Sequence, residues 1–145
     1  MDKKIALAAD HAGYELKECI KHYLADRGFE VIDFGTNSAE SVDYPDFAHK
    51  LGDAIDKDEV LRGIAICGTG NGISMALNKH QKVRCALSWN KEIAALGRQH
   101  NNANVVALPA RFISEEEAKQ VVQTFLDTPF EGGRHERRVN KIACW

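Results

Sequence analysis

The sequence predicts an α/β protein: a five-stranded parallel sheet with helices on both faces and a short basic helix at the C-terminal end. Five short β-rich runs alternate with segments of helical character, and such alternation is typical of βαβ units. The composition agrees, because 44% hydrophobic and 28% charged residues are ordinary values for a globular chain.

The predicted strands cover residues 5–9, 29–34, 63–67, 83–89 and 104–108. After the first strand, apolar residues recur at helical spacing (Leu16, Ile20, Tyr23 and Leu24), and Gly28 is placed to end that helix. A second helix is expected to begin at Pro45, since proline suits the first helical position. Residues 73–79 indicate a third, shorter helix.

The firmest helix prediction lies near the C-terminal end. Ser114 and Glu117 form a capping-box pattern in front of an apolar stripe made of Ala118, Val121, Val122, Phe125 and Leu126. The last segment, GGRHERRVNKIACW, indicates a break followed by a short basic helix.

Length and composition exclude several classes of protein. A chain of 145 residues fits one domain, taken as residues 1–145, and no apolar run approaches the roughly 20 residues that span a bilayer. Because MDKKIALAADHAG does not resemble a signal peptide, the cytoplasm is the expected compartment. The four cysteines form no C-x-x-C pair, and the net charge is −2, so we expect neither a metal nor a nucleic-acid partner.

A glycine loop follows the third predicted strand in ICGTGNGIS, residues 66–74. Strand, glycine loop and helix together favour an anion site, because backbone N–H groups can converge on one point beside the positive end of the helix dipole. The loop lacks the G-K-[ST] ending of a P-loop and the G-x-G-x-x-G spacing of a dinucleotide fingerprint. By itself it predicts only an anion, and a tight turn that needs glycine is the plainer alternative.

Cys67 stands directly before this loop. A thiol at a helix N-terminus is stabilised as the thiolate, which can act as a base or a nucleophile. Packing in the core is an equal alternative, since cysteine is among the most buried residue types.

Polar residues at other strand ends are further candidates. Asp10 and His11 end the first strand, and the carboxyl ends of parallel strands are where ligands collect. His100 lies in a polar cluster that a solvated helix end would also explain. Arg134 and Arg138 are four residues apart, so both face one side of a helix and could grip one phosphate, although a solvated basic tail is the simpler interpretation.

Taken together, these motifs resemble the ribose-5-phosphate isomerase B and galactose-6-phosphate isomerase family of sugar-phosphate isomerases. Six motifs in register carry the resemblance over nearly the whole chain: DHAG at 10–13, DYP at 43–45, ICGTGNGIS, NK at 78–79, RQHNNAN at 98–104 and EGGRHERRV at 131–139. The resemblance implies a doubly wound, Rossmann-like fold and a homodimer, possibly paired into a tetramer, with active sites shared between subunits. It implies neither metal nor cofactor.

The resemblance also implies a role for each candidate residue. Cys67 would be the base that moves a proton between C2 and C1 of the open-chain sugar, and His100 would open the sugar ring. The oxyanion would be stabilised by Thr69 and by the glycine loop, with Gly68, Gly70, Asn71, Gly72 and Ser74 among its members. Asp10 and Asn101 would bind sugar hydroxyls, Tyr44 would line the site, and His11, Arg134 and Arg138 would bind phosphate.

Arg111 would be a further phosphate ligand, supplied by the second subunit, and the roles of His135 and Arg137 stay open. Some family members place the base on a glutamate just after the glycine loop, but here that position is Ile73, so Cys67 has no local substitute. Ribose 5-phosphate is the expected substrate, because this one chain holds the whole set of site residues. Allose 6-phosphate and galactose 6-phosphate remain alternatives, as does a non-catalytic module that binds a phosphorylated metabolite.

Overall fold

The computed structural model describes residues 2–145 and contains one five-stranded parallel sheet in the order β2-β1-β3-β5-β4. The strands are β1 (Lys4–Ala9), β2 (Glu30–Asp33), β3 (Gly63–Cys67), β4 (Cys85–Leu87) and β5 (Val105–Pro109). Every residue of β3 and β5 is buried, as expected of central parallel strands covered on both faces. The predicted sheet and its five strands are confirmed.

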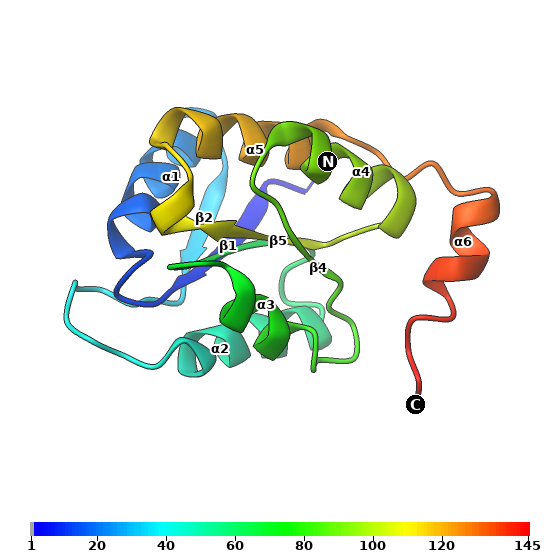
Figure 1. Cartoon of the computed structure of the whole chain (residues 1–145), viewed down its shortest axis with the longest axis horizontal. Coiled ribbons are helices and arrows are strands. Elements are labelled where there is room, and N and C mark those ends of the chain that lie inside the picture. The colour runs from blue at the N-terminus through cyan, green and yellow to red at the C-terminus, as the bar shows by residue number, and fades with distance from the viewer. Residues whose placement is uncertain (1) are drawn as a thin grey trace.

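Helices cover both faces of this sheet (Figure 1). α1 (Tyr14–Asp26), α4 (Lys91–Asn101) and α5 (Glu115–Asp127) lie on one face, and α2 (Tyr44–Asp56) and α3 (Asn71–Leu77) lie on the other. Apolar residues of each layer form a separate core cluster against the sheet. No helix within residues 2–145 is both long enough and apolar enough to cross a membrane.

Several local predictions are confirmed in detail. The Ser114 hydroxyl accepts from Glu117 N at 3.1 Å, and the Glu117 carboxylate accepts from Ser114 N at 3.1 Å, so the capping box is complete. Pro45 occupies the first turn of α2, which begins one residue earlier than predicted. Gly28 follows α1 with a φ of 85°, a backbone conformation that favours glycine.

Three elements differ from the prediction: the third helix, expected over 73–79, covers Asn71–Leu77, and β4 and α4 also depart from it. β4 is only three residues long. The Asn104 side chain accepts a hydrogen bond from Arg84 N at 2.8 Å, which keeps the residues before Cys85 out of the backbone pairing with β5. α4 was not predicted beyond a possible helix end at His100; its N-cap is Asn90, whose side chain accepts from Ile93 N at 2.9 Å.

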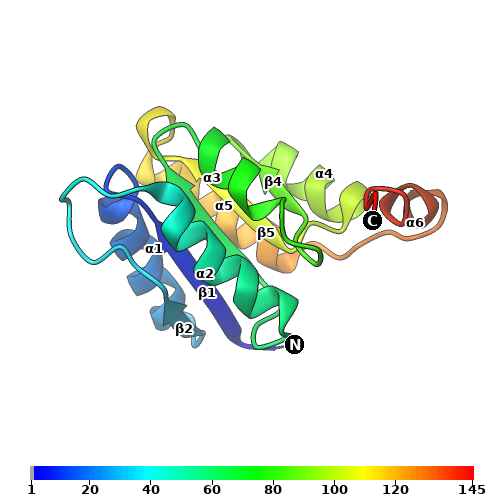
Figure 2. The same ribbon diagram turned by 90° about the horizontal axis from the view of Figure 1, so that it is seen from below.

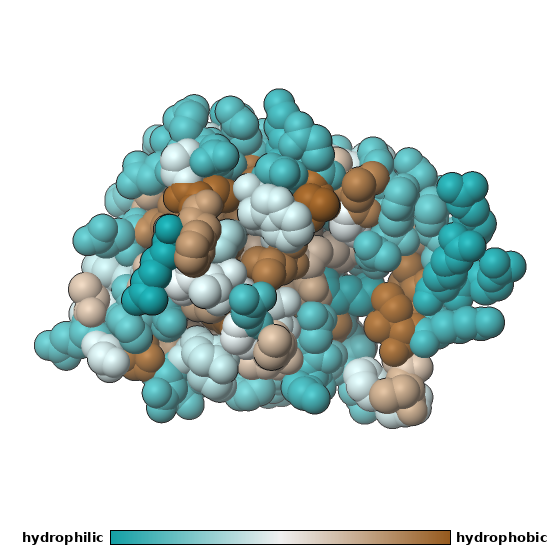
Figure 3. Space-filling view, in the orientation of Figure 1, coloured by the Kyte–Doolittle hydropathy of each residue, from teal (hydrophilic) through white to brown (hydrophobic). Residues whose placement is uncertain are grey.

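The short helix α6 (Arg134–Val139) stands apart from the two layers as an arm (Figures 1 and 2). It packs against α4 beyond the starting ends of the strands, opposite the edge at which β1 and β3 end. Figure 3 shows a hydrophilic outer side on this arm and hydrophobic residues on the side that faces the body. A hollow of about 340 Å³ lies there, lined in part by Asn78, Val139, Ile142 and Trp145.

Candidate active site

The carboxyl ends of β1 and β3 bring the first candidate residues together. Cys67 is the last residue of β3, and Asp10 follows β1, the neighbouring strand. Asp10 N donates to Ile66 O at 3.2 Å, which joins the two strand ends directly. The Asp10 side chain also accepts from Gly13 N at 3.1 Å through Oδ1. A predicted sugar-hydroxyl partner and the predicted base therefore share one edge of the sheet.

Gly13 makes this approach possible. A Cβ at this position would lie 2.5 Å from Ile66 O, closer than real Cβ contacts, so only glycine lets the start of α1 approach β3. Packing therefore explains the glycine of the DHAG motif, just as the proposed chemistry explains its aspartate and histidine.

The glycine loop has the conformation that an anion site needs. Gly70 has a φ of 77° and caps α3, a left-handed conformation that favours glycine. Asn71 N donates to Thr69 Oγ1 at 3.2 Å, and Ser74 N donates to Gly70 O at 3.2 Å, so both amides are already occupied. Their predicted role toward an oxyanion stays a prediction. The amides of Gly70 and Gly72 have no acceptor among residues 2–145 and remain available.

Tyr44 and His11 border the loop from the other side. Tyr44 begins α2 and packs on Gly72, where a Cβ would lie 2.5 Å from the Tyr44 Cζ. His11 Nδ1 accepts from Val42 N at 3.1 Å. Because Nδ1 is the acceptor, the neutral ring carries its proton on Nε2 and can donate there. That tautomer suits the predicted contact with a phosphate oxygen.

Arg111 lies beside the glycine loop of its own chain. Arg111 N donates to Gly68 O at 3.0 Å, and its Nη1 lies 3.2 Å from the position that a Cβ of Gly68 would occupy. This placement groups Arg111 with Cys67 of the same chain, and its role as a phosphate ligand in a shared site stays a prediction. The backbone bond to Gly68 fixes Arg111 at the end of β5, directly beside Cys67 at the end of β3.

A second thiol, Cys85 on the edge strand β4, which the sequence did not mark as important, packs against the core cluster that contains Cys67. Burial raises the pKa of the Cys85 thiol to about 12, a hydrogen bond with the Ser74 side chain opposes this shift, and Cys67 adds to it. Cys85 is therefore held as the uncharged thiol. No spacing in the sequence could have signalled this neighbour, because Cys85 reaches Ser74 from a strand at the far edge of the sheet.

The remaining predicted residues lie at the opposite end of the molecule. His100 and Asn101 end α4, just before β5 begins. Asn101 lines a pocket of about 280 Å³ together with Arg84, Cys85, Ala103 and Ile142. Cys67 pairs with Pro109, at the other end of β5. The five residues of β5 span about 13 Å at 3.3 Å per residue, which is far beyond hydrogen-bond reach.

Arg134 and Arg138 share the location of His100 rather than that of Cys67. Both lie on α6, which packs against α4 (Figure 1). One chain therefore presents two separate groups of candidate residues. One holds Asp10, His11, Tyr44, Cys67, the glycine loop and Arg111; the other holds His100, Asn101, Arg134 and Arg138.

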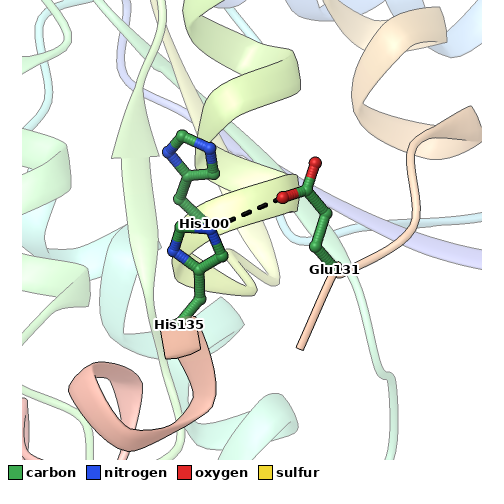
Figure 4. A group of neighbouring side chains, drawn as sticks. All are labelled: His100, Glu131 and His135. Atoms are coloured by element: carbon green, nitrogen blue, oxygen red, sulfur yellow. Dashed lines mark ion pairs between the residues drawn. The ribbon is translucent and has the colours of Figure 1, made fainter. Parts of the chain in front are cut away.

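His100 has two close neighbours of its own (Figure 4). The rings of His100 and His135 are stacked, with centroids 4.2 Å apart and an interplanar angle of 12°. His135 Nε2 lies 3.4 Å from Glu131 Oε1. The ligand atoms of these three residues lie within 4.8 Å of one another, as do those of Asp53, Asp56 and His80. Either group could hold a metal ion, and neither includes Cys67.

Comparison with known proteins decides the family. The family model described as Ribose/Galactose Isomerase matches residues 5–142. The chain belongs to this family. It is 46% identical over 142 residues to ribose-5-phosphate isomerase B of Escherichia coli, covering 98% of this chain and 95% of that protein.

Solved structures of family members agree over nearly the whole fold. A ribose 5-phosphate isomerase from Thermotoga maritima is 53% identical, with a TM-score of 0.95 over 98% of each chain. Ribose-5-phosphate isomerase B of Mycoplasma genitalium, solved with bound ribulose-5-phosphate, is 45% identical, with a TM-score of 0.92 over 96% of this chain and 93% of that one. The resemblance inferred from the sequence is thereby confirmed, and so is the doubly wound α/β fold.

Proposed function

We propose that the protein interconverts ribose 5-phosphate and ribulose 5-phosphate, with Cys67 as the base. The observation that carries this proposal is the position of Cys67 at the end of β3, directly before a loop whose Gly70 and Gly72 amides are unoccupied. Proton abstraction from carbon creates an oxyanion, and backbone donors aimed at that charge stabilise it. Family relatives named for this reaction, one with ribulose-5-phosphate bound, support the same substrate.

The chemical step moves two protons and leaves the carbon skeleton unchanged. In the open-chain aldose, the Cys67 thiolate takes the proton from C2, and the carbonyl at C1 becomes the oxyanion of an enediolate. The hydroxyl proton on O2 then shifts to O1, and Cys67 returns the carbon-bound proton to C1, which leaves the carbonyl at C2 and gives the ketose. Gly70 and Gly72 follow Cys67 by three and five residues in the chain. Removing one donor to an oxyanion typically costs roughly 2.7–4 kcal/mol in the barrier.

The opposite placement of these two groups of residues within one chain supports a homodimer in which each active site takes residues from both subunits. His100 must come within hydrogen-bond reach of the sugar that Cys67 deprotonates, yet the two residues lie at opposite ends of β5 within one chain. In a symmetric dimer the α6 arm and the end of α4 of one subunit would meet the glycine loop of the other. Exposed apolar side chains flank the edge strand β4 and offer a surface for that contact: Met75, Trp89 and Leu96.

In this arrangement the phosphate is held from two sides. Arg134 and Arg138 of one subunit would face His11 and Arg111 of the other, while Asp10 and Asn101 would bind sugar hydroxyls. Tetramer formation would add contacts between dimers without changing the site.

An assay of the purified protein with three phosphorylated sugars tests this proposal. We expect kcat/KM to be highest for ribose 5-phosphate, lower for allose 6-phosphate and galactose 6-phosphate, and to fall steeply for Cys67→Ala, which should still bind inorganic phosphate. Galactose 6-phosphate as the best substrate would overturn the pentose assignment. Near-normal turnover by Cys67→Ala would overturn the role of the thiol, and binding without any turnover would favour a non-catalytic module.

A further inference from the structure

The α6 arm is joined to the rest of the protein through two glycines that restrict its orientation little. Gly132 and Gly133 precede it with φ values of 70° and 56°, and a Cβ at either position would meet nothing within 4 Å. Of the six residues of α6, only His135 is buried, with 8% of its surface exposed. The arm that carries Arg134 and Arg138 is therefore seated on the body largely through one histidine.

The ring of His135 packs against the ring of His100 (Figure 4). The two imidazoles are nearly parallel, at 12°, with centroids 4.2 Å apart. Glu131 completes the contact, because its Oε1 lies 3.4 Å from His135 Nε2 and its backbone N donates to Gln99 O at 3.1 Å. Glu131 thus ties the segment before α6 to the helix that carries His100.

The charges around the pair favour a neutral His135. Burial lowers the pKa of His135, and the positive charges of His100, Arg134 and Arg138 lower it further, while Glu131 acts in the opposite direction. Two stacked imidazolium rings would repel each other, and this repulsion is absent when His135 is neutral.

We propose that His135 is a positioning residue that couples the phosphate-binding arm to the orientation of His100. This inference rests on the proposed function, in which Arg134 and Arg138 bind phosphate and His100 opens the sugar ring. When phosphate orders the arm, His135 is pressed against His100 and fixes the plane of its ring. Removing His135 leaves His100 present but free to rotate.

The chemistry of the two sugars separates this role from a general structural one. Ribose 5-phosphate closes a furanose ring through its C4 hydroxyl and must be opened before Cys67 can act. Ribulose 5-phosphate cannot close a furanose ring, because the C5 oxygen carries the phosphate. Exchange of its C1 hydrogen with solvent deuterium therefore reports the Cys67 step without ring opening.

The test compares His135→Ala and His135→Phe with the exposed neighbour Glu136→Gln as the matched control. For each variant, kcat and KM are measured with ribose 5-phosphate, and C1 exchange of ribulose 5-phosphate is followed in D₂O by NMR. We expect His135→Ala to lower kcat for ribose 5-phosphate by roughly tenfold or more, part of the roughly 10²- to 10⁴-fold that acid–base catalysis contributes. C1 exchange should change by less than about twofold, and His135→Phe, which can still stack, should recover much of the loss.

Equal losses in both measurements, an increase in KM alone, or no loss would each overturn the inference. If His135→Ala does not fold, the test rests on His135→Phe. The inference then requires that this variant keep the rate of C1 exchange and show a smaller loss of kcat that is confined to ribose 5-phosphate. Wild-type protein that neither isomerises ribose 5-phosphate nor exchanges the C1 hydrogen of ribulose 5-phosphate would instead refute the proposed function.

Discussion

The ring of Tyr44 lies so close to Gly72 that a methyl group on Gly72 would come 2.5 Å from the Tyr44 Cζ and 2.9 Å from its hydroxyl oxygen. Two motifs that are 28 residues apart in the sequence thus meet as one wall of the candidate active site. The contact explains why this position of the loop is glycine, although its φ does not require one.

Gly72→Ala should therefore lower kcat/KM for ribose 5-phosphate by roughly ten- to a hundredfold. The added methyl must displace either Tyr44 or the loop, and a shift of about 1 Å at an active site can cost on the order of a hundredfold. The double variant Gly72→Ala/Tyr44→Ala should lose less than the sum of the two single variants in free energy, because the clash is gone. Strictly additive losses would show that the two residues act independently.

Arg134→Ala should raise KM for ribose 5-phosphate steeply and change the reaction of unphosphorylated ribose little. The guanidinium meets only the phosphate in the proposed site, and Arg134 and Arg138 are one helical turn apart on α6. Arg137→Ala, an exposed neighbour on the same helix, serves as the control. Equal penalties with both sugars would remove the phosphate role from Arg134.

Activity should survive exhaustive treatment with EDTA. The oxyanion can be stabilised by the Gly70 and Gly72 amides beside Cys67, and the groups that could hold a metal do not include that thiol. Initial rates with ribose 5-phosphate before and after chelation provide the measurement. Loss of activity that a divalent ion restores would refute this prediction.

The buried pair of Lys17 and Asp33 should make stability depend on acid pH. Lys17 is fully buried, and its Nζ lies 2.6 Å from Asp33 Oδ2. Burial alone would raise the pKa of Asp33, but hydrogen bonds from Lys17, Gly35 and Lys21 hold it below its ordinary value of 3.8. The stabilisation is therefore complete above the unfolded-state pKa and is lost as the pH falls through the folded-state value.

Asp33→Asn should lower the free energy of unfolding by about 3 kcal/mol at neutral pH, because the buried Lys17 Nζ loses its ion pair with Asp33 and keeps only the one with Glu18 Oε2, at 2.8 Å. The same substitution should also make the free energy of unfolding depend less on pH below about 4. Asp58→Asn, which breaks the exposed pair with Lys82, is the matched control and should cost less than about 1 kcal/mol. Urea titrations at several pH values measure both, and equal losses for the two variants would contradict the account.

Sequence patterns predicted the sheet and most helices because each has a local signal, such as the capping box at Ser114 or the β-rich run at 63–67. They also placed Asp10, Cys67 and the glycine loop at one edge, since parallel strands end together. Contacts between distant segments left no such signal. The hydrogen bond from Val42 N to His11 and the stacking of His135 on His100 depend on packing alone.

Arg111 is another residue whose contacts the sequence could not predict. The sequence resemblance supplied a role for this residue but not its position relative to the glycine loop. The backbone bond to Gly68 places it with Cys67, and that bond exists only once β3 and β5 are paired.

The most direct test of the account is complementation between Cys67→Ala and His100→Ala chains. Each homodimer lacks one essential group at both sites, whereas a mixed dimer with shared sites has one site with both groups intact. Random exchange at equal amounts should restore about a quarter of the wild-type activity, since half of the dimers are mixed and half of their sites are intact. No recovery after subunit exchange has been verified by mass spectrometry would mean that each chain builds its site alone.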